Sequence, residues 1–201
     1  MIISFEGGEG AGKTRHASFL CNYLNVKGIA PEILREPGGT VFSEKVRGLF
    51  LEEGISPMTE LLLVLASRNE NITTLIRPAL SRCRLVIIDR FIDSTLVYQG
   101  VAGGLGVEKV REIMEMTGTW IEPDITFVLD AEPEITLQRI KPDDKFEKKD
   151  IGFHQMLREG FLTLSNQKRH RIIDTGRSPG DVEKDIIEVI EKDCLPCIGD
   201  I

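Results

Sequence analysis

The feature that most constrains the fold of this chain is a glycine-rich segment close to its start. It fits the phosphate-binding pattern GxxxxGK(S/T) and reads Gly7-Gly8-Glu9-Gly10-Ala11-Gly12-Lys13-Thr14. Residues 2–6 before it are apolar and β-prone, and residues 15–27 after it carry apolar side chains at helical spacing. A strand, a glycine loop and a helix in this order predict one unit of a parallel α/β sheet.

The chemistry of this segment predicts a site for a nucleoside triphosphate. Glycines let the backbone curl so that several N–H groups point inward at a polyphosphate, and the N-terminus of the helix adds partial positive charge. Lys13 is then placed to reach the β- and γ-phosphates, and the Thr14 hydroxyl to bind Mg²⁺. Residues 7–14 are therefore all candidate ATP-binding residues.

The rest of the chain alternates β-like apolar runs with helical patterns, which is typical of an α/β fold with a five-stranded parallel sheet. The predicted strands cover residues 2–6, 31–35, 85–89, 125–130 and 170–174. The predicted helices cover residues 15–27, 41–53, 60–80, 107–117, 132–140, 151–167 and 180–193. Pro78 is expected to bend or end the long helix over 60–80. The length of 201 residues and the lack of a linker predict one domain over 1–201.

Composition argues against several classes of function. With 25 basic and 32 acidic residues the net charge is −7, whereas nucleic-acid surfaces usually have a basic excess. No apolar run approaches the ~20 residues of a membrane span, and the chain starts directly in a core strand. We therefore expect a cytoplasmic protein without a membrane or nucleic-acid partner. Cys194 and Cys197 have CxxC spacing but no second pair that would complete a zinc site, so no role is assigned to them.

Charged residues follow the second and third predicted strands, at the edge where ligands of parallel sheets collect. Asp89 ends the third strand after four apolar residues, a position from which a carboxylate can hold Mg²⁺ beside the phosphate loop. Arg90 follows it directly, and Arg35 ends the second strand. Because a guanidinium group binds two phosphate oxygens at once, the two arginines predict a second anionic site that faces the first.

Residues 140–150 interrupt the alternation with a proline and a high density of charge. Such a run is usually a solvated loop. Because it follows the fourth predicted strand and its helix, it is alternatively a mobile lid that closes over the phosphates. We favour the lid.

Five motifs occur in order along the chain: residues 5–14, Arg35-Glu36-Pro37-Gly38-Gly39-Thr40, Ala66-Ser67-Arg68, Asp89-Arg90-Phe91-Ile92-Asp93-Ser94 and Tyr98-Gln99-Gly100. Over nearly the whole chain, their spacing resembles that of the bacterial thymidylate kinases, P-loop enzymes that phosphorylate dTMP to dTDP with ATP. The resemblance implies ATP with Mg²⁺ as donor and dTMP as acceptor. It also implies a three-layer fold with strand order 2-3-1-4-5 and helices on both faces of the sheet, and a homodimer.

The resemblance further implies roles for individual residues. Arg35 and Arg90 would hold the 5′-phosphate of dTMP, and Arg68 would bind a thymine carbonyl. Glu9 would lie near the sugar 3′-hydroxyl, with Tyr98 beside the sugar. The other candidate dTMP-binding residues are Pro37, Val64, Ser94, Thr95 and Gln99, and the Glu36–Pro37 bond is a candidate cis peptide.

One departure from the family pattern concerns the base. Val64 stands where a phenylalanine commonly stacks on thymine, which removes a stacking energy of about 1 kcal/mol. An aromatic ring from elsewhere, Phe42, Phe50 or Phe91, could replace it.

A second departure concerns the lid. Lys145 stands where the family often has an arginine, in the segment Asp144-Lys145-Phe146-Glu147, and lysine lacks the bidentate fork of arginine. Arg139 or Lys145 is therefore the candidate cation for the transition state. Together with Lys13 and Arg90, these residues make up the predicted catalytic set.

Other functions stay open at this point. Val64 is compatible with a kinase of another nucleoside monophosphate, such as dUMP, or of a deoxynucleoside. A GTPase-type switch or ATPase partner protein is a rival from another class, but no Asn-Lys-x-Asp guanine motif occurs in the chain. A nucleotide-binding protein without catalysis would not need Asp89 and the paired arginines.

Overall fold

The computed structural model describes residues 1–82 and 84–194, and its centre is a five-stranded sheet. All neighbouring strands are parallel, and their order is β2-β3-β1-β4-β5, which confirms the predicted fold. Each strand lies within one residue of its predicted range: β1 (Ile2–Glu6), β2 (Glu32–Arg35), β3 (Val86–Asp89), β4 (Ile125–Asp130) and β5 (His170–Asp174).

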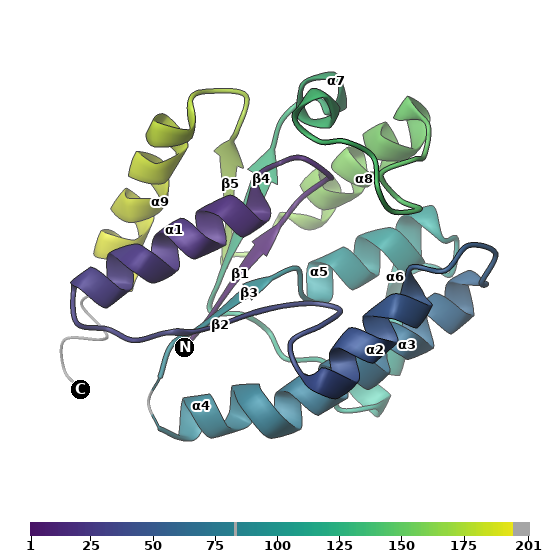
Figure 1. Ribbon diagram of the computed structural model, residues 1–201, viewed down its shortest axis with the longest axis horizontal. Helices are drawn as coiled ribbons and strands as arrows, with labels where there is room; N and C mark the ends of the chain where they lie inside the picture. Colours follow the sequence, from purple (N-terminus) through teal and green to yellow (C-terminus); the bar gives the residue numbers. More distant parts are fainter. Residues whose placement is uncertain (83, 195–201) are drawn as a thin grey trace.

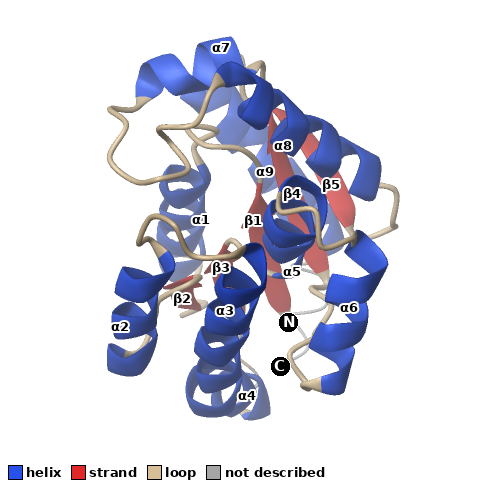
Figure 2. Cartoon of the chain, turned by 90° about the vertical axis from the view of Figure 1, so that its right-hand side faces the viewer, coloured by secondary structure: helices blue, strands red, loops and turns tan. Residues whose placement is uncertain are grey.

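Helices connect the strands and cover both faces of the sheet (Figures 1 and 2). The α-helices are α1 (Lys13–Val26), α2 (Val41–Phe50), α3 (Pro57–Asn71), α4 (Arg77–Ser81), α5 (Ile92–Thr95), α6 (Val107–Met116), α7 (Pro133–Thr136), α8 (Ile151–Leu164) and α9 (Pro179–Asp193). Two π-helical segments, η1 (Ile72–Ile76) and η2 (Leu96–Ala102), and one 3-10 segment, η3 (Leu137–Arg139), adjoin them. Within the described ranges, none of these helices is long and apolar enough to cross a bilayer.

The sheet is the middle of three layers. On one face α1 and α9 lie side by side, and Leu20 and Ile186 pack with Ile3 and Phe127 of the sheet (Figure 1). On the other face, apolar side chains of α3, α4, α5 and α6 form a second cluster with β1 and β3. Because both faces are covered, the central strands are buried throughout, which explains their continuous apolar sequences.

The structure differs from the sequence-based prediction at residues 92–102, which form α5 and η2 but were predicted as no element. Every residue from 91 to 100 is buried, so this part of the segment has no solvent-exposed face and shows none of the apolar-polar alternation that signals a surface helix. Pro78 does not end the long helix, which continues to Ser81. The π-turn η1 comes just before it, so Pro78 occupies the first turn of α4, where the missing N–H leaves no bond unmade.

The register of the central strands places the predicted site residues at one edge. Phe5 lies opposite Asp89 in the β1–β3 pair, and Asp89 lies opposite Arg35 in the β2–β3 pair. The glycine loop that follows β1 therefore begins beside the carboxyl ends of β2 and β3. α7 lies beyond the carboxyl ends of β4 and β5, at the same end of the molecule (Figure 1).

Candidate active site

A cavity of about 700 Å³ lies at this edge of the sheet. Most of the predicted site residues line it: Glu9, Gly10, Ala11, Gly12, Lys13, Thr14, Arg35, Pro37, Val64, Arg68, Asp89, Arg90, Ser94, Thr95, Tyr98, Gln99 and Arg139. Gly7 and Gly8, at the start of the loop, line a separate hollow next to β4, and Lys145 does not line the cavity. Segments more than 80 residues apart in the chain thus form one continuous surface.

The glycine loop forms one end of the cavity and is built mainly from backbone. Gly10 and Gly12 have φ values of +69° and +93°, a region that other residues rarely adopt. A Cβ atom on Gly10 would lie 2.1 Å from the carbonyl oxygen of Thr136 in α7, so this position has no room for a side chain. α1 begins directly after the loop, with its unpaired N–H groups at the cavity.

Lys13, the first residue of α1, crosses the loop. Its Nζ donates a hydrogen bond to the carbonyl oxygen of Gly8 at 2.5 Å, and its side chain is buried. Burial, together with the positive charge of Arg90, lowers the pKa of Lys13 to about 8, although Glu9 and Asp89 oppose the shift. The phosphates of a bound nucleotide would stabilise the charged ammonium group of Lys13, because they would place further negative charge beside this buried lysine.

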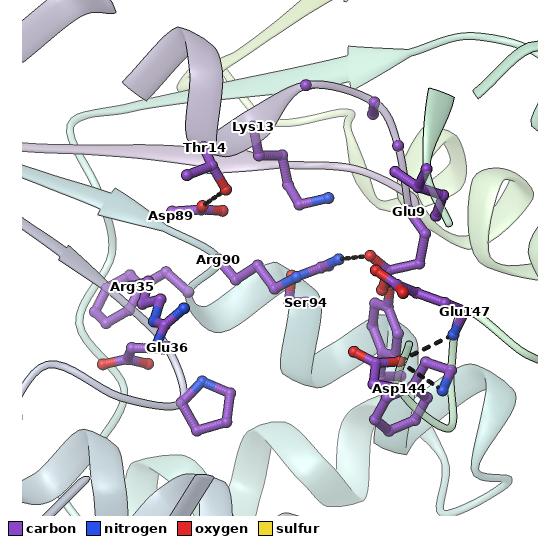
Figure 3. Close-up of a pocket in the computed structure, with 18 of the residues that line it drawn as sticks. Glu9, Lys13, Thr14, Arg35, Glu36, Asp89, Arg90, Ser94, Asp144 and Glu147 are labelled. Atoms are coloured by element: carbon purple, nitrogen blue, oxygen red, sulfur yellow. Dashed lines mark hydrogen bonds and ion pairs between the residues drawn. The ribbon is translucent and has the colours of Figure 1, made fainter. Parts of the chain in front are cut away.

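Thr14 and Asp89 meet beside Lys13 (Figure 3). The Thr14 hydroxyl donates to Oδ2 of Asp89 at 2.5 Å. The pair supplies two adjacent oxygen ligands, the type that Mg²⁺ prefers, and Mg²⁺ usually takes its other ligands from water and substrate phosphates. The described residues contain no group of three or more His, Cys, Asp or Glu that could hold a metal alone.

Arg90 reaches across the cavity from the end of β3 (Figure 3). Its backbone has a φ of 66°, which turns the side chain toward the glycine loop. Its guanidinium forms an ion pair of 2.7 Å with Glu9, donates to the carbonyl oxygen of Gly7 at 3.2 Å and lies 5.0 Å from the centre of the Tyr98 ring. Burial alone would lower the pKa of Arg90, but the charge of Glu9, together with Tyr98, Asp89 and Glu6, outweighs burial and raises the pKa above its ordinary value.

Glu9 is held from two sides. The Tyr98 hydroxyl donates to Oε1 of Glu9 at 2.6 Å, while Oε2 pairs with Arg90. Burial opposes ionisation of Glu9, but the charges of Arg90 and Lys13 outweigh it and lower its pKa to about 2. Glu9 is therefore a fully ionised carboxylate at the centre of the cavity.

Glu6, which the sequence analysis assigned no role, holds the turn that carries Arg90. Its carboxylate accepts hydrogen bonds from the Phe91 N–H at 2.8 Å and from the Ser94 hydroxyl at 2.5 Å. Burial and the nearby charge of Asp93 raise the pKa of Glu6 to about 7. The structure thus gives the Ser94 hydroxyl a partner within the protein, behind the cavity wall.

Two further arginines face Arg90. Arg35 pairs with Glu44 at 3.0 Å, and Arg47 of α2 donates to the carbonyl oxygen of Pro37 at 3.0 Å. Burial, with the charges of Arg35 and Arg90, lowers the pKa of Arg47. Mutual repulsion of this kind is relieved by an anion bound between the arginines. The sequence analysis missed Arg47, although the Thr40 N-cap, which starts α2 beside the cavity, was a usable signal.

Arg68 is buried and held in an ion pair. Its Nε lies 2.6 Å from Oε2 of Glu36, and its Nη2 donates to the Thr95 hydroxyl at 2.8 Å. The guanidinium also lies 4.9 Å from the centre of the Phe91 ring. The Glu36–Pro37 bond is cis, as expected from the sequence.

The wall beside Arg68 is apolar and contains Val64. Phe50 and Phe91, two of the three aromatic residues considered as substitutes for a stacking phenylalanine, line the cavity. Phe42 does not line it, and its side chain is half exposed. Two of the three candidate aromatic rings, Phe50 and Phe91, therefore line the same cavity as Val64.

The predicted lid, residues 140–150, lies over this apolar wall. Phe146 packs against Phe50 and Tyr98, with ring centres 5.4 and 5.3 Å apart. Lys145 does not line the cavity and forms an ion pair of 2.6 Å with Glu60 of α3. Arg139 lines the cavity, and its Nη2 donates to the carbonyl oxygen of Thr175 at 2.8 Å. Of the two predicted lid cations, the structure brings Arg139 to the cavity and leaves Lys145 outside it.

The sequence analysis also missed Glu36 and Glu60 as partners of site residues. No local signal could have found them, because Arg68 lies 32 residues from Glu36, and Lys145 lies 85 residues from Glu60. Cys197 of the CxxC motif lies outside the described residues.

A cavity with one anion-binding end for a triphosphate and another for a second phosphate is what phosphoryl transfer between two nucleotides requires. By fold and site, the protein is a P-loop nucleotide kinase. A family model described as "Thymidylate kinase" matches residues 5–186. Thymidylate kinases of Symbiobacterium thermophilum and Thermoanaerobacter sp. are each 42% identical to this chain, over 96% and 95% of its length and 93% and 97% of their own.

The structural comparison agrees. The crystal structure of thymidylate kinase from Ehrlichia chaffeensis matches with a TM-score of 0.79 at 32% identity, covering 94% of this chain and 98% of that one. The chain belongs to the thymidylate kinase family.

Proposed function

We propose that the protein transfers the γ-phosphoryl group of ATP to dTMP, giving dTDP and ADP. The observation that carries the proposal is the shared cavity. The loop with Lys13 forms one end, and the guanidinium groups of Arg35, Arg47 and Arg90 form the other. Relatives named thymidylate kinase support dTMP as the acceptor.

The reaction needs position and charge more than proton chemistry. An acceptor phosphate is already an anionic nucleophile, so no general base is required. Lys13 and the loop N–H groups hold the donor phosphates, while Arg35 and Arg90 hold the acceptor phosphate in line with them. Arg139, on the lid side, is the remaining cation that we propose for the transferred group.

Mg²⁺ is part of the proposal because Thr14 and Asp89 supply the oxygen ligands that suit it. When bound, the ion neutralises charge on the β- and γ-phosphates. The protein's own contribution is to hold the Thr14 hydroxyl and the Asp89 carboxylate beside Lys13. The metal site and the lysine then both lie next to the donor phosphates.

The acceptor nucleoside is proposed to lie along the opposite wall. Glu9 and Tyr98 lie where the sugar would extend from a phosphate held by Arg90. Arg68 lies deeper, where a base carbonyl would reach. The base would contact Pro37, Val64, Ser94, Thr95 and Gln99, with Phe50 and Phe91 as the nearby rings.

Three broader features belong to the same proposal. We infer a single domain over 1–201 with a lid at about 140–150, since Phe146 seats that segment on the cavity wall. A homodimer follows from the family resemblance and is tested by light scattering after gel filtration. A cytoplasmic location fits an enzyme whose two substrates are nucleotides of the cell interior.

The decisive experiment measures ADP formation from ATP·Mg²⁺ with dTMP, dUMP, dCMP, dGMP, AMP and thymidine as separate acceptors. Turnover that depends on dTMP, with dTDP as product, is the expected result. Faster turnover with another acceptor would replace dTMP in the proposal. Hydrolysis of ATP that is independent of any acceptor would favour a switch or an ATPase.

A further inference from the structure

Glu60 lies in the first turn of α3 and uses both carboxylate oxygens at the acceptor end of the cavity. Oε1 pairs with Nζ of Lys145 at 2.6 Å, and Oε2 accepts a hydrogen bond from Nε2 of Gln99 at 3.2 Å. The side chains of Glu60 and Lys145 are only 13% and 9% exposed, and Gln99 is buried. One carboxylate thus joins the lid to a residue of the cavity wall.

The chemistry of the carboxylate decides which way the Gln99 amide points. Carboxylate oxygens accept hydrogen bonds, and here Oε1 of Glu60 accepts from Lys145 while Oε2 accepts from Gln99. The group of Gln99 that faces Glu60 must therefore be its NH₂. The carbonyl oxygen of Gln99 is left at the other end of the amide, and it has no hydrogen-bond partner within residues 1–82 and 84–194.

That oxygen is available to a ligand, because Gln99 lines the cavity next to Thr95 and Arg68. A site that presents an acceptor there favours a base edge with a ring N–H. Thymine and uracil carry a hydrogen on N3, whereas N3 of cytosine is itself an acceptor. An acceptor facing an acceptor leaves both groups unpaired in a buried site, which is costly.

We propose that Glu60 is a positioning residue that sets the direction of the Gln99 amide and so makes the acceptor end select bases with a ring N–H. This rests on the proposed function, since it assumes that a pyrimidine monophosphate occupies the cavity. The role of Lys145 is separate, because it anchors the lid, with a further hydrogen bond of 3.1 Å to the carbonyl oxygen of Glu52.

The test compares Glu60→Gln with the wild type in kcat/KM for dTMP, dUMP and dCMP. A glutamine at this position can present either its oxygen or its NH₂, so the Gln99 amide is no longer held in one direction. The preference for dTMP over dCMP should fall about tenfold, mainly through a higher KM for dTMP. The preference for dTMP over dUMP should stay the same, because both bases carry the N3 hydrogen. An unchanged dTMP/dCMP ratio would overturn the proposal.

Lys145→Met is the matched control, because it removes the lid anchor and keeps the carboxylate beside Gln99. It should change turnover without lowering the dTMP/dCMP preference. Equal loss of preference in both variants would show that the lid, and not the amide direction, controls base choice.

A double variant, Glu60→Gln with Lys145→Gln, leaves no buried charge unpaired and serves if Glu60→Gln fails to fold. It should show the same relaxed preference. The wild-type profile separates the two proposals: without dTMP turnover the proposed function fails, whereas dTMP turnover with a preference insensitive to Glu60 refutes only the role of Glu60.

Discussion

The two ends of the cavity are built in different ways. The donor end comes from one continuous segment, residues 7–14, and its chemistry resides in backbone groups and the start of α1. The acceptor end is made of side chains from several elements between β2 and α5, and two of its arginines, Arg68 and Arg90, are held by ion pairs with distant partners. A continuous segment can be recognised wherever it occurs, but a network of long-range pairs exists only once the chain has folded.

The difference implies that substitutions at the two ends should fail in different ways. Removal of a side chain at the acceptor end should slow phosphoryl transfer. Where its ion-pair partner is buried, the removal should also lower the free energy of unfolding. Loss of a glycine at the donor end should affect ATP binding.

The largest expected effect is that of Arg90→Ala. It removes the guanidinium that pairs with Glu9 and is proposed to hold the acceptor phosphate. Turnover with dTMP should fall about 1000-fold, the scale seen when a charge-stabilising donor is lost, while ATP affinity changes little. Steady-state assays and calorimetric titration with ATP measure the two effects. Arg111→Ala, at an exposed arginine of α6 paired with Glu115, is the control. Near-normal dTMP turnover in Arg90→Ala would refute the role.

Arg68→Ala comes next and tests whether the acceptor end is also a structural network. The substitution leaves Glu36 buried without its ion-pair partner, which should cost about 3 kcal/mol in the free energy of unfolding. Arg35→Ala breaks the exposed pair with Glu44 and should cost less than about 1 kcal/mol. Denaturant titration measures both. Similar costs for the two variants would contradict the buried network.

At the donor end, Gly10→Ala should weaken ATP binding by about thirtyfold, or about 2 kcal/mol, because its φ of +69° and the nearby Thr136 carbonyl both oppose a side chain. KM values for ATP and dTMP measure the effect, and only that for ATP should rise. Gly8→Ala is the matched control, since no atom lies within 4 Å of a Cβ placed there. A rise of the dTMP KM alone would contradict the division between the two ends.

The smallest effect concerns Glu6, which supports the acceptor end from behind. Its pKa is raised from 4.5 to about 7, so the folded protein holds a proton on Glu6 that the unfolded chain releases near pH 4.5. The stabilisation that this protonation provides is present at low pH and is lost as the pH rises through 7. Between pH 6 and 8 the wild type should therefore lose about 1 kcal/mol of stability relative to Glu6→Gln, which resembles the protonated form.

Unfolding free energies of both proteins at pH 6 and pH 8 provide the measurement. The comparison removes the contributions of all other titrating groups that the two proteins share. A constant difference across this range would show that Glu6 does not titrate there.

The fold could be predicted well because its strands are short, apolar and covered on both faces, as at Val86–Asp89. The phosphate loop could be recognised because residues 7–14 are contiguous. The helical segment over 92–102 could not be predicted, since its residues 92–100 are all buried and show no solvent-exposed polar face. Lys145 could not be placed from the sequence either, because the charge that attracts it, on Glu60, lies in another helix. Side-chain partners at long range are set by tertiary structure and leave no local pattern.

The position of β1 has a consequence for how the protein is made. β1 comes first in the chain but lies in the middle of the sheet, between β3 and β4. Its pairing partners start at Val86 and Ile125, so at roughly 5–20 residues per second the ribosome needs several seconds to supply the first of them. During that time the apolar strand Ile2–Glu6 has no sheet to join. Chaperones that bind exposed apolar segments should therefore meet this chain at Ile2–Glu6, before the sheet can close around that strand.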